Sequence, residues 1–178
     1  DTGTPSDGTV GSSKFASGDL TFPSDITIPD KIIHTGDTNT AIRFPSADTV
    51  AIETGGSERL RIDSNGKIGI GITPSGWGSS TDNTVIQAKN GVIWEYAGVQ
   101  FDIGHNYYYD GTDYHFIRSN YASRQTFHNN DGSIAFWSGG TGSADGSITW
   151  AEKCRIKANG NVEVTDGDLV IGTSGHGI

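Results

Sequence analysis

Two related stretches of this sequence have the alternation of a β-hairpin, and they constrain the fold more than any other feature. The first, at residues 58–74, reads ERLRIDSNGKIGIGITP, and the second, at residues 152–164, reads EKCRIKANGNVEV. The aliphatic residues that alternate with charged residues or glycine in the first copy are Leu60, Ile62, Ile68, Ile70 and Ile72. Period-two alternation places such side chains on one face of a strand, and the central Asn65 and Gly66 suit the two positive φ values of a tight turn. Each copy therefore predicts a two-stranded hairpin with one apolar face.

The second copy indicates which face points inward. Cys154 occupies the position of Leu60, so we expect it to be a small core residue. Glu163 replaces Gly69, so the other face of that strand tolerates bulk. A lone hairpin is marginally stable in water, and we expect other copies of the chain to cover the apolar face. In such an assembly Gly69 and Gly71 permit close backbone approach.

The composition is unusual for a globular core. Hydrophobic residues make up 33% of the 178 residues, against the usual ~45–50% when Gly is counted. Charged residues are only 19% and aromatic residues reach 10%, which is not the composition of a disordered chain. An ordered chain that is short of apolar residues is expected to bury surface against partners. The chain contains no Met, and we expect it to be a processed product or a segment of a longer protein.

Charge and hydropathy exclude several classes of partner. The net charge of −9 argues against nucleic acid and anionic membrane surfaces. No apolar run approaches the ~18–20 residues of a membrane span, so membrane insertion is not expected. The single cysteine rules out an intrachain disulfide framework.

Turn residues divide the chain into β segments with little room for helices. We expect one short strand near Ile26–Ile28, and strands rather than a helix in residues 112–131. A polar, Gly-rich break at residues 75–83 precedes an aromatic-rich region. The predicted organisation is an extended connector (1–30), a β-hairpin shaft segment (31–75), an aromatic-rich, knob-like β domain (76–151) and a second shaft hairpin segment (152–178).

The hairpin motif resembles a motif that recurs in tail-fibre and related virion proteins of tailed bacteriophages, especially those of marine bacteria. The segments YYYDGTDYHFI and GSITWAEKCRIKANGNVEV are also similar to that group. The resemblance covers roughly residues 29–178 and implies an all-β, elongated homotrimeric fibre, with a triple β-helix or β-prism-like shaft and an aromatic-rich β insert. It also implies a location in the extracellular virion and contact with other tail proteins. The predicted trimer core consists of Leu60, Ile62, Ile68, Ile70, Ile72, Cys154 and Ile156.

No catalytic, metal or cofactor site is expected. The residues TSGHG at 173–177 lack the context of a nucleophile elbow, and the histidines form no metal-binding pair. Paired carboxylates for glycoside hydrolysis would have to come from Glu95, Asp102, Asp110, Asp113, Asp131 and Glu152, where turn or solvated roles are favoured. The candidates for stacking on a host-surface glycan are Trp94, Tyr107, Tyr109, Tyr114 and Trp137, although these rings also suit the core of the aromatic region.

Three functions fit these observations. The favoured one is a structural component of a bacteriophage tail fibre, a trimeric, non-enzymatic shaft or knob that spaces and presents a surface for host attachment. The second is a monomeric carbohydrate-binding module of a bacterial surface protein. The third is a polysaccharide-degrading tail spike.

Overall fold

A computed structural model describes residues 24–80, 83–165 and 167–168. The described part is all-β, with fourteen strands and no helix. The strands are β1 (Lys31–His34), β2 (Asp37–Arg43), β3 (Val50–Thr54), β4 (Ser57–Ile62), β5 (Ile68–Ile70), β6 (Asn83–Ala88), β7 (Gly91–Tyr96), β8 (Gln100–His105), β9 (Tyr107–Tyr109), β10 (Tyr114–Phe116), β11 (Asn120–His128), β12 (Ile134–Gly142), β13 (Ala151–Ile156) and β14 (Val162–Val164). The all-β prediction is therefore confirmed. The predicted strand near Ile26–Ile28 is wrong, because those residues lie outside any strand.

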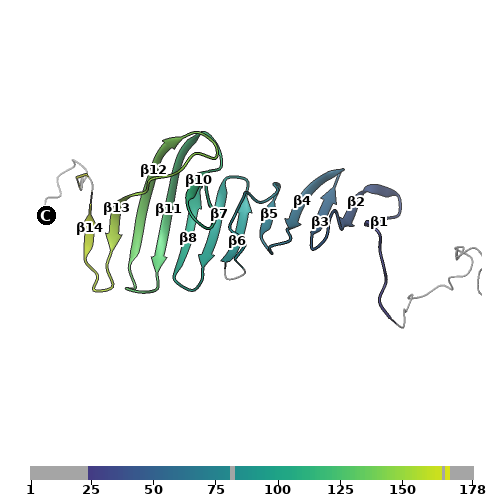
Figure 1. The fold of residues 1–178 in the computed structure, drawn as a ribbon, viewed down its shortest axis with the longest axis horizontal. Helices are drawn as coiled ribbons and strands as arrows, with labels where there is room; N and C mark the ends of the chain where they lie inside the picture. The colour runs from purple at the N-terminus through teal and green to yellow at the C-terminus, as the bar shows by residue number, and fades with distance from the viewer. Residues whose placement is uncertain (1–23, 81–82, 166, 169–178) are drawn as a thin grey trace, which may run out of the picture.

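Twelve strands form one long sheet in the order β1-β2-β3-β4-β5-β6-β7-β8-β11-β12-β13-β14. Figure 1 shows this sheet as an elongated strip with β1 and β14 at opposite ends. Neighbouring strands are antiparallel except β5 and β6, which pair in parallel with Ile68 opposite Ile86. The sheet runs through both predicted boundaries, at residues 75/76 and 151/152, so the two segments predicted to form a shaft and the aromatic region share one sheet. The predicted connector lies mostly outside the described residues.

The turn at Asn65 and Gly66 differs from the prediction. Only Gly66 of the pair has a positive φ, of 74°, and the loop spans residues 63–67 between the paired Ile62 and Ile68. The Asp63 carboxylate accepts hydrogen bonds from the backbone N–H groups of Asn65 and Lys67, both at 2.9 Å. An Asp side chain that bonds its own turn stabilises a wider loop than a two-residue turn. The prediction of two positive φ values was therefore wrong here.

The predicted strand 68–72 ends early. β5 stops at Ile70, Gly71 has a φ of 66°, and the chain turns back across the sheet before it begins β6. A Cβ added at Gly69 would overlap the carbonyl oxygen of Ile72 and lie 2.9 Å from Pro74 Cδ. Gly69 thus does permit close backbone approach, but to its own chain. Ile72 does not continue the alternation of Ile68 and Ile70, because it lies in the connection that crosses from β5 to β6. This connection allows β6 to run parallel to β5.

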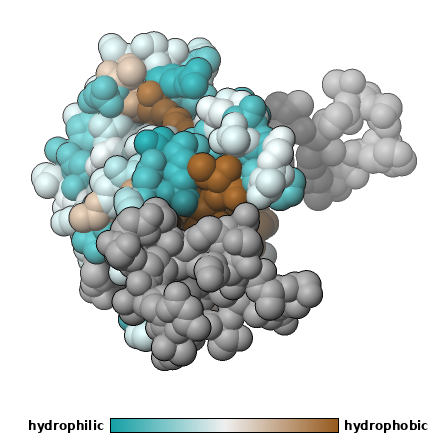
Figure 2. All heavy atoms as spheres, turned by 90° about the vertical axis from the view of Figure 1, so that its right-hand side faces the viewer, coloured by the Kyte–Doolittle hydropathy of each residue, from teal (hydrophilic) through white to brown (hydrophobic). Residues whose placement is uncertain are grey.

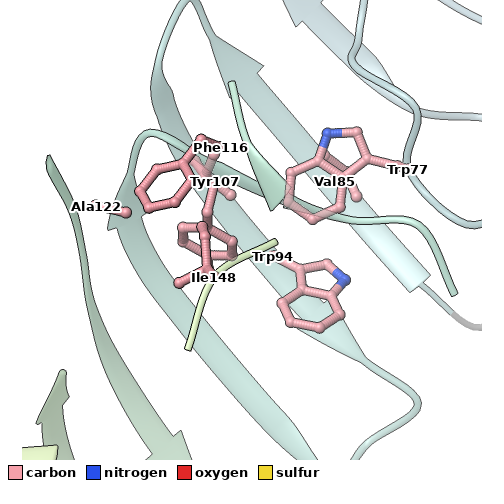
Figure 3. Close-up of a cluster of buried hydrophobic side chains, with 8 residues drawn as sticks. Trp77, Val85, Trp94, Tyr107, Phe116, Ala122 and Ile148 are labelled. Atoms are coloured by element: carbon pink, nitrogen blue, oxygen red, sulfur yellow. The ribbon is translucent and has the colours of Figure 1, made fainter. Parts of the chain in front are cut away.

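One face of the sheet is covered over its middle. The small β9–β10 sheet lies against it near β7 and β8 (Figure 1), and the segment between β12 and β13 joins it through a bridge between His115 and Ser147. Buried side chains fill the space between the sheet and these segments (Figure 3): Trp77, Val85, Val92, Trp94, Tyr107, Phe116, Ala122 and Ile148. Aromatic rings therefore supply most of the core.

Candidate functional site: an uncovered apolar sheet face

The face opposite this core carries a row of apolar side chains along most of the strip. Residues paired directly across antiparallel strands project from the same face, so the register identifies each row. The central row crosses ten strands and consists of Val50, Ile62, Ile68, Ile86, Ile93, Ile103, Gln125, Phe136, Cys154 and Val164. Gln125 is its one polar member.

Shorter rows flank the central one. On one side, over β1 to β5, the row consists of Ile32, Ile42, Ile52, Leu60 and Ile70. On the other side, over β8 to β14, the row consists of Phe101, Phe127, Ile134, Ile156 and Val162. These twenty residues are called the apolar face below. None of them is charged.

The described part of the chain leaves this face open. Ile52 and Ile103 are 40% and 48% exposed, although they lie in the middle of β3 and β8, and Ile70 at the end of β5 is 46% exposed. Hydrophobic side chains also reach the surface between hydrophilic ones at the β1 end of the strip (Figure 2). Soluble monomers rarely expose a contiguous apolar patch that extends over so many strands. Large patches of this kind mark interaction surfaces.

The opposite face of the first strands is built for water. The Glu53 carboxylate receives Lys31 Nζ at 3.0 Å and Arg43 Nη1 at 3.1 Å, and these donors lower the pKa of Glu53 below its ordinary value. Ala51 pairs with Arg43 on one side and Arg61 on the other, and it is fully buried. The aliphatic stems of long charged side chains cover small residues in this way. On these first strands, charged side chains therefore cover one face of the sheet and meet the water. No described side chains cover the apolar face in this way.

Most of the predicted trimer-core residues lie together on the apolar face. They are Leu60, Ile62, Ile68, Ile70, Cys154 and Ile156. Ile72 does not lie on it, since it follows the end of β5. Sequence reasoning missed the part contributed by β6 to β8, including Ile93 and Ile103. In β7, GVIWEY, Val92 and Trp94 enter the core while Ile93 faces outward, so both strand faces are apolar and no alternation is visible.

The predicted glycan-binding rings are largely occupied. Trp94 and Tyr107 are 1% and 0% exposed, so the expectation that they stack on a sugar does not fit their burial. Tyr114 and Trp137 instead receive the Arg124 guanidinium, whose central carbon lies 4.5 Å and 5.3 Å from the two ring centroids. A chain with few aliphatic residues builds its core from aromatic rings, and these rings belong to the core of the aromatic region. Tyr109 is half-buried at the edge of this cluster.

A buried ion pair lies beneath these rings. Asp102 is fully buried, and its Oδ2 accepts from Arg124 Nη1 at 2.9 Å and from the Tyr107 hydroxyl at 3.1 Å. Burial raises the pKa of Tyr107 well above its ordinary value, so the hydroxyl keeps its proton and donates. Of the candidate carboxylates, Asp102 therefore has a structural environment that leaves it out of reach of a substrate.

Comparison of the chain with family models, with curated proteins and with solved structures finds no match in any of the three. Across residues 24–80, 83–165 and 167–168 no group of three His, Cys, Asp or Glu side chains is placed to hold a metal ion. The same described ranges contain no helix with the length and apolarity needed to cross a membrane.

Proposed function

We propose that the chain is a non-enzymatic structural segment of a homotrimeric fibre, in which the apolar faces of three chains pack around one axis. The observation that carries this proposal is the uncharged central row, which crosses ten strands with a single polar member. Other copies of the chain are the natural occupants, because three identical strips place the same long rows against one another.

The energy of burial favours association. Fully burying an exposed aliphatic side chain contributes about 1.5–3 kcal/mol, so burying the remaining two fifths of one contributes roughly 1 kcal/mol. Summed over the apolar face, the gross gain is on the order of 10 kcal/mol per chain. This is comparable with the ~4–15 kcal/mol that association costs in lost freedom of motion, and each chain gains contacts with two others.

The shape of the apolar face supports an axis along the strip. In each strand only about two successive inward positions are apolar, which makes a stripe whose rows lie about 7 Å apart. A stripe that is narrow along each strand and long across the strands suits packing around a central line. A two-sheet sandwich uses a broader inner face.

The fibre would be the tail fibre, or a comparable appendage, of a bacteriophage, as the resemblance of the hairpin motif implies. In that role the segment spaces and presents a host-binding surface in the virion, alongside other tail proteins. Immunogold labelling of particles from a phage whose genome encodes the chain tests this assignment. Label on the tail appendages is expected, and label on the capsid alone would overturn it.

The oligomeric state tests the assembly. Native mass spectrometry and analytical ultracentrifugation of the full chain should give three times the 18.8 kDa chain mass. Ile70→Asp should abolish the trimer, because it places a charge in each of three packed rows. Ile33→Asp is the matched control: Ile33 is 49% exposed, against 46% for Ile70, but it pairs with Ala41 on the opposite face. A stable monomer of the unmodified chain would refute the proposal and favour the carbohydrate-binding module.

A further inference from the structure

A groove of about 560 Å³ opens on the core side of the sheet, away from the apolar face. It lies where the start of β6 and the end of β7 meet the turn that follows β9. Asn83 and Tyr96 are cross-strand partners on one side of it, and Tyr109, Asp110 and Thr112 line the other. Because Asn83 and Tyr96 alternate with residues of the opposite face, packing of the apolar face leaves the groove open.

Two tyrosine rings form a rigid aromatic corner in this groove. The centroids of Tyr96 and Tyr109 lie 5.8 Å apart with their planes at 79°. Trp94 supports both rings, at 5.5 Å from Tyr96 and 5.4 Å from Tyr109. Gly78 N–H donates to the Tyr109 carbonyl at 2.9 Å and fixes the neighbouring wall. The rings are half-buried, so each keeps a part that a ligand can contact.

The polar groups of the groove are chiefly acceptors. Asn83 is 7% exposed, and its Oδ1 is buried without a hydrogen-bond partner in the structure described. A buried acceptor is normally satisfied, so Asn83 Oδ1 is an exception within the wall of the groove, and it is closed to solvent. Asp110 is held in place because its Oδ1 accepts from the N–H groups of Asp113 and Thr112, both at 2.8 Å. These bonds lower the pKa of Asp110, and its carboxylate stays ionised.

Charge narrows the class of ligand. Among the described residues the groove lining contains no Lys, Arg or His; Asp110 supplies a negative charge, and its Oδ2 lies 3.0 Å from Nε2 of His115, which is not part of the lining. The nearby Lys67 is 1% exposed, and its ammonium group is directed at backbone: it donates to the carbonyl oxygens of Ser80 at 3.0 Å and Asn83 at 2.6 Å. Lys67 thus positions the wall that carries Asn83. A phosphate, sulfate or uronic acid would find no Lys or Arg among the described residues that line the groove.

We propose that this groove binds a neutral sugar ring of a polysaccharide, with the apolar face of the sugar against Tyr96 and Tyr109 and its hydroxyls donating to the exposed carboxylate of Asp110. Flat aromatic faces with nearby fixed acceptors are the chemistry that recognises a neutral hexose. As a glycan-binding role this extends the presenting function proposed above. It does not depend on trimer formation, so the two proposals fail separately.

The test is saturation-transfer NMR and calorimetry of the full chain with a panel of neutral gluco-, galacto- and manno-oligosaccharides, and with acidic oligogalacturonate. We expect binding to at least one neutral sugar and none to the acidic one. Tyr109→Ala should weaken binding more than tenfold. Thr112→Trp, at an exposed position on the rim, should do the same by filling the groove, and it leaves the packing of Trp94 untouched.

Tyr121→Ala is the control, because Tyr121 is 66% exposed and does not line the groove. It should bind as the unmodified chain does. The proposal is overturned if no neutral sugar of the panel binds, if oligogalacturonate binds more tightly than all of them, or if Thr112→Trp and Tyr121→Ala bind equally well.

Discussion

Replacing Arg124 with Met should be among the most damaging single changes in the sheet. The Arg124 guanidinium donates a hydrogen bond from Nη1 to Asp102 Oδ2 at 2.9 Å. Both side chains are buried: Arg124 is 8% exposed and Asp102 is 0% exposed. The guanidinium also lies over the rings of Tyr114 and Trp150, at 4.5 Å and 4.6 Å from the ring centroids. Met retains most of the aliphatic volume, so the substitution chiefly removes charge and hydrogen bonds.

The expected loss follows from this burial. Breaking a buried pair by removing one partner costs about 3–5 kcal/mol, because the remaining charge is left uncompensated. The lost cation–π contacts add about 0.5–2 kcal/mol. Arg61→Met is the matched control, since Arg61 pairs with Glu58 at 2.6 Å with the side chains 20% and 26% exposed. A pair of that kind is worth about 0–1 kcal/mol.

Urea unfolding at one fixed protein concentration measures the difference, because any association shifts the apparent stability. With m near ~2 kcal/mol/M, Arg124→Met should lower the midpoint by roughly 1.8–3.5 M, and Arg61→Met by less than about 0.5 M. Adding Asp102→Asn to Arg124→Met should recover part of the loss, because it removes the stranded charge but keeps an acceptor for the Tyr107 hydroxyl. Equal midpoints for the two arginine variants, or a further loss in the double variant, would refute the reasoning.

Two further predictions concern the first half of the sheet. Gly69→Ala should lower the free energy of unfolding by roughly 1–3 kcal/mol, since its Cβ meets the backbone of Ile72; Gly76→Ala, whose Cβ would lie 3.6 Å from the nearest atom, should cost far less in the same urea experiment. Acid should destabilise the β1–β3 region, because Lys31 and Arg43 lower the pKa of Glu53 in the folded state below its ordinary 4.5. The stability that Glu53 contributes is present above pH 4.5 and is lost as the pH falls through the lower folded-state value, so Glu53→Gln should flatten the fall in melting temperature on acidification.

The strands β2 to β4 were predictable because each has one largely polar and one apolar face. In β3 the buried Ala51 and Glu53 alternate with the exposed Val50 and Ile52, and period two is visible in the sequence. The aromatic region hides this signal, since its strands pack a core on one face and present Ile93 and its neighbours on the other. Period-two alternation is visible in a sequence only where one face of a strand is polar and the other apolar. In the strands of the aromatic region both faces are apolar.

The groove could not be found from sequence for a different reason. Tyr109 was among the predicted glycan-binding residues, but its partners Tyr96 and Asn83 were not. They reach the groove through the pairing of β6 with β7 and through the return of the chain after β9, contacts that no local pattern encodes. The position of Lys67 is likewise invisible in the sequence: its ammonium group donates to backbone carbonyl oxygens of the groove wall and not to a ligand position.

The two hairpin copies differ at the glycine position of the second strand and agree in their aliphatic alternation. In the first copy Gly69 is required because the crossover to β6 passes over it. The second copy has Glu163 there, paired with Arg155 and bonded by Lys157, since no described segment of the chain covers that face. Gly69 is therefore needed for a contact within one chain, the close approach of the Ile72 backbone. What both copies keep is the aliphatic alternation, at Ile68 and Ile70 in one and at Val162 and Val164 in the other, all exposed or half-buried in a single chain. Retention of the alternation where the internal contact is missing supports the proposed packing of several copies of the chain, which would use the same apolar face at both hairpins.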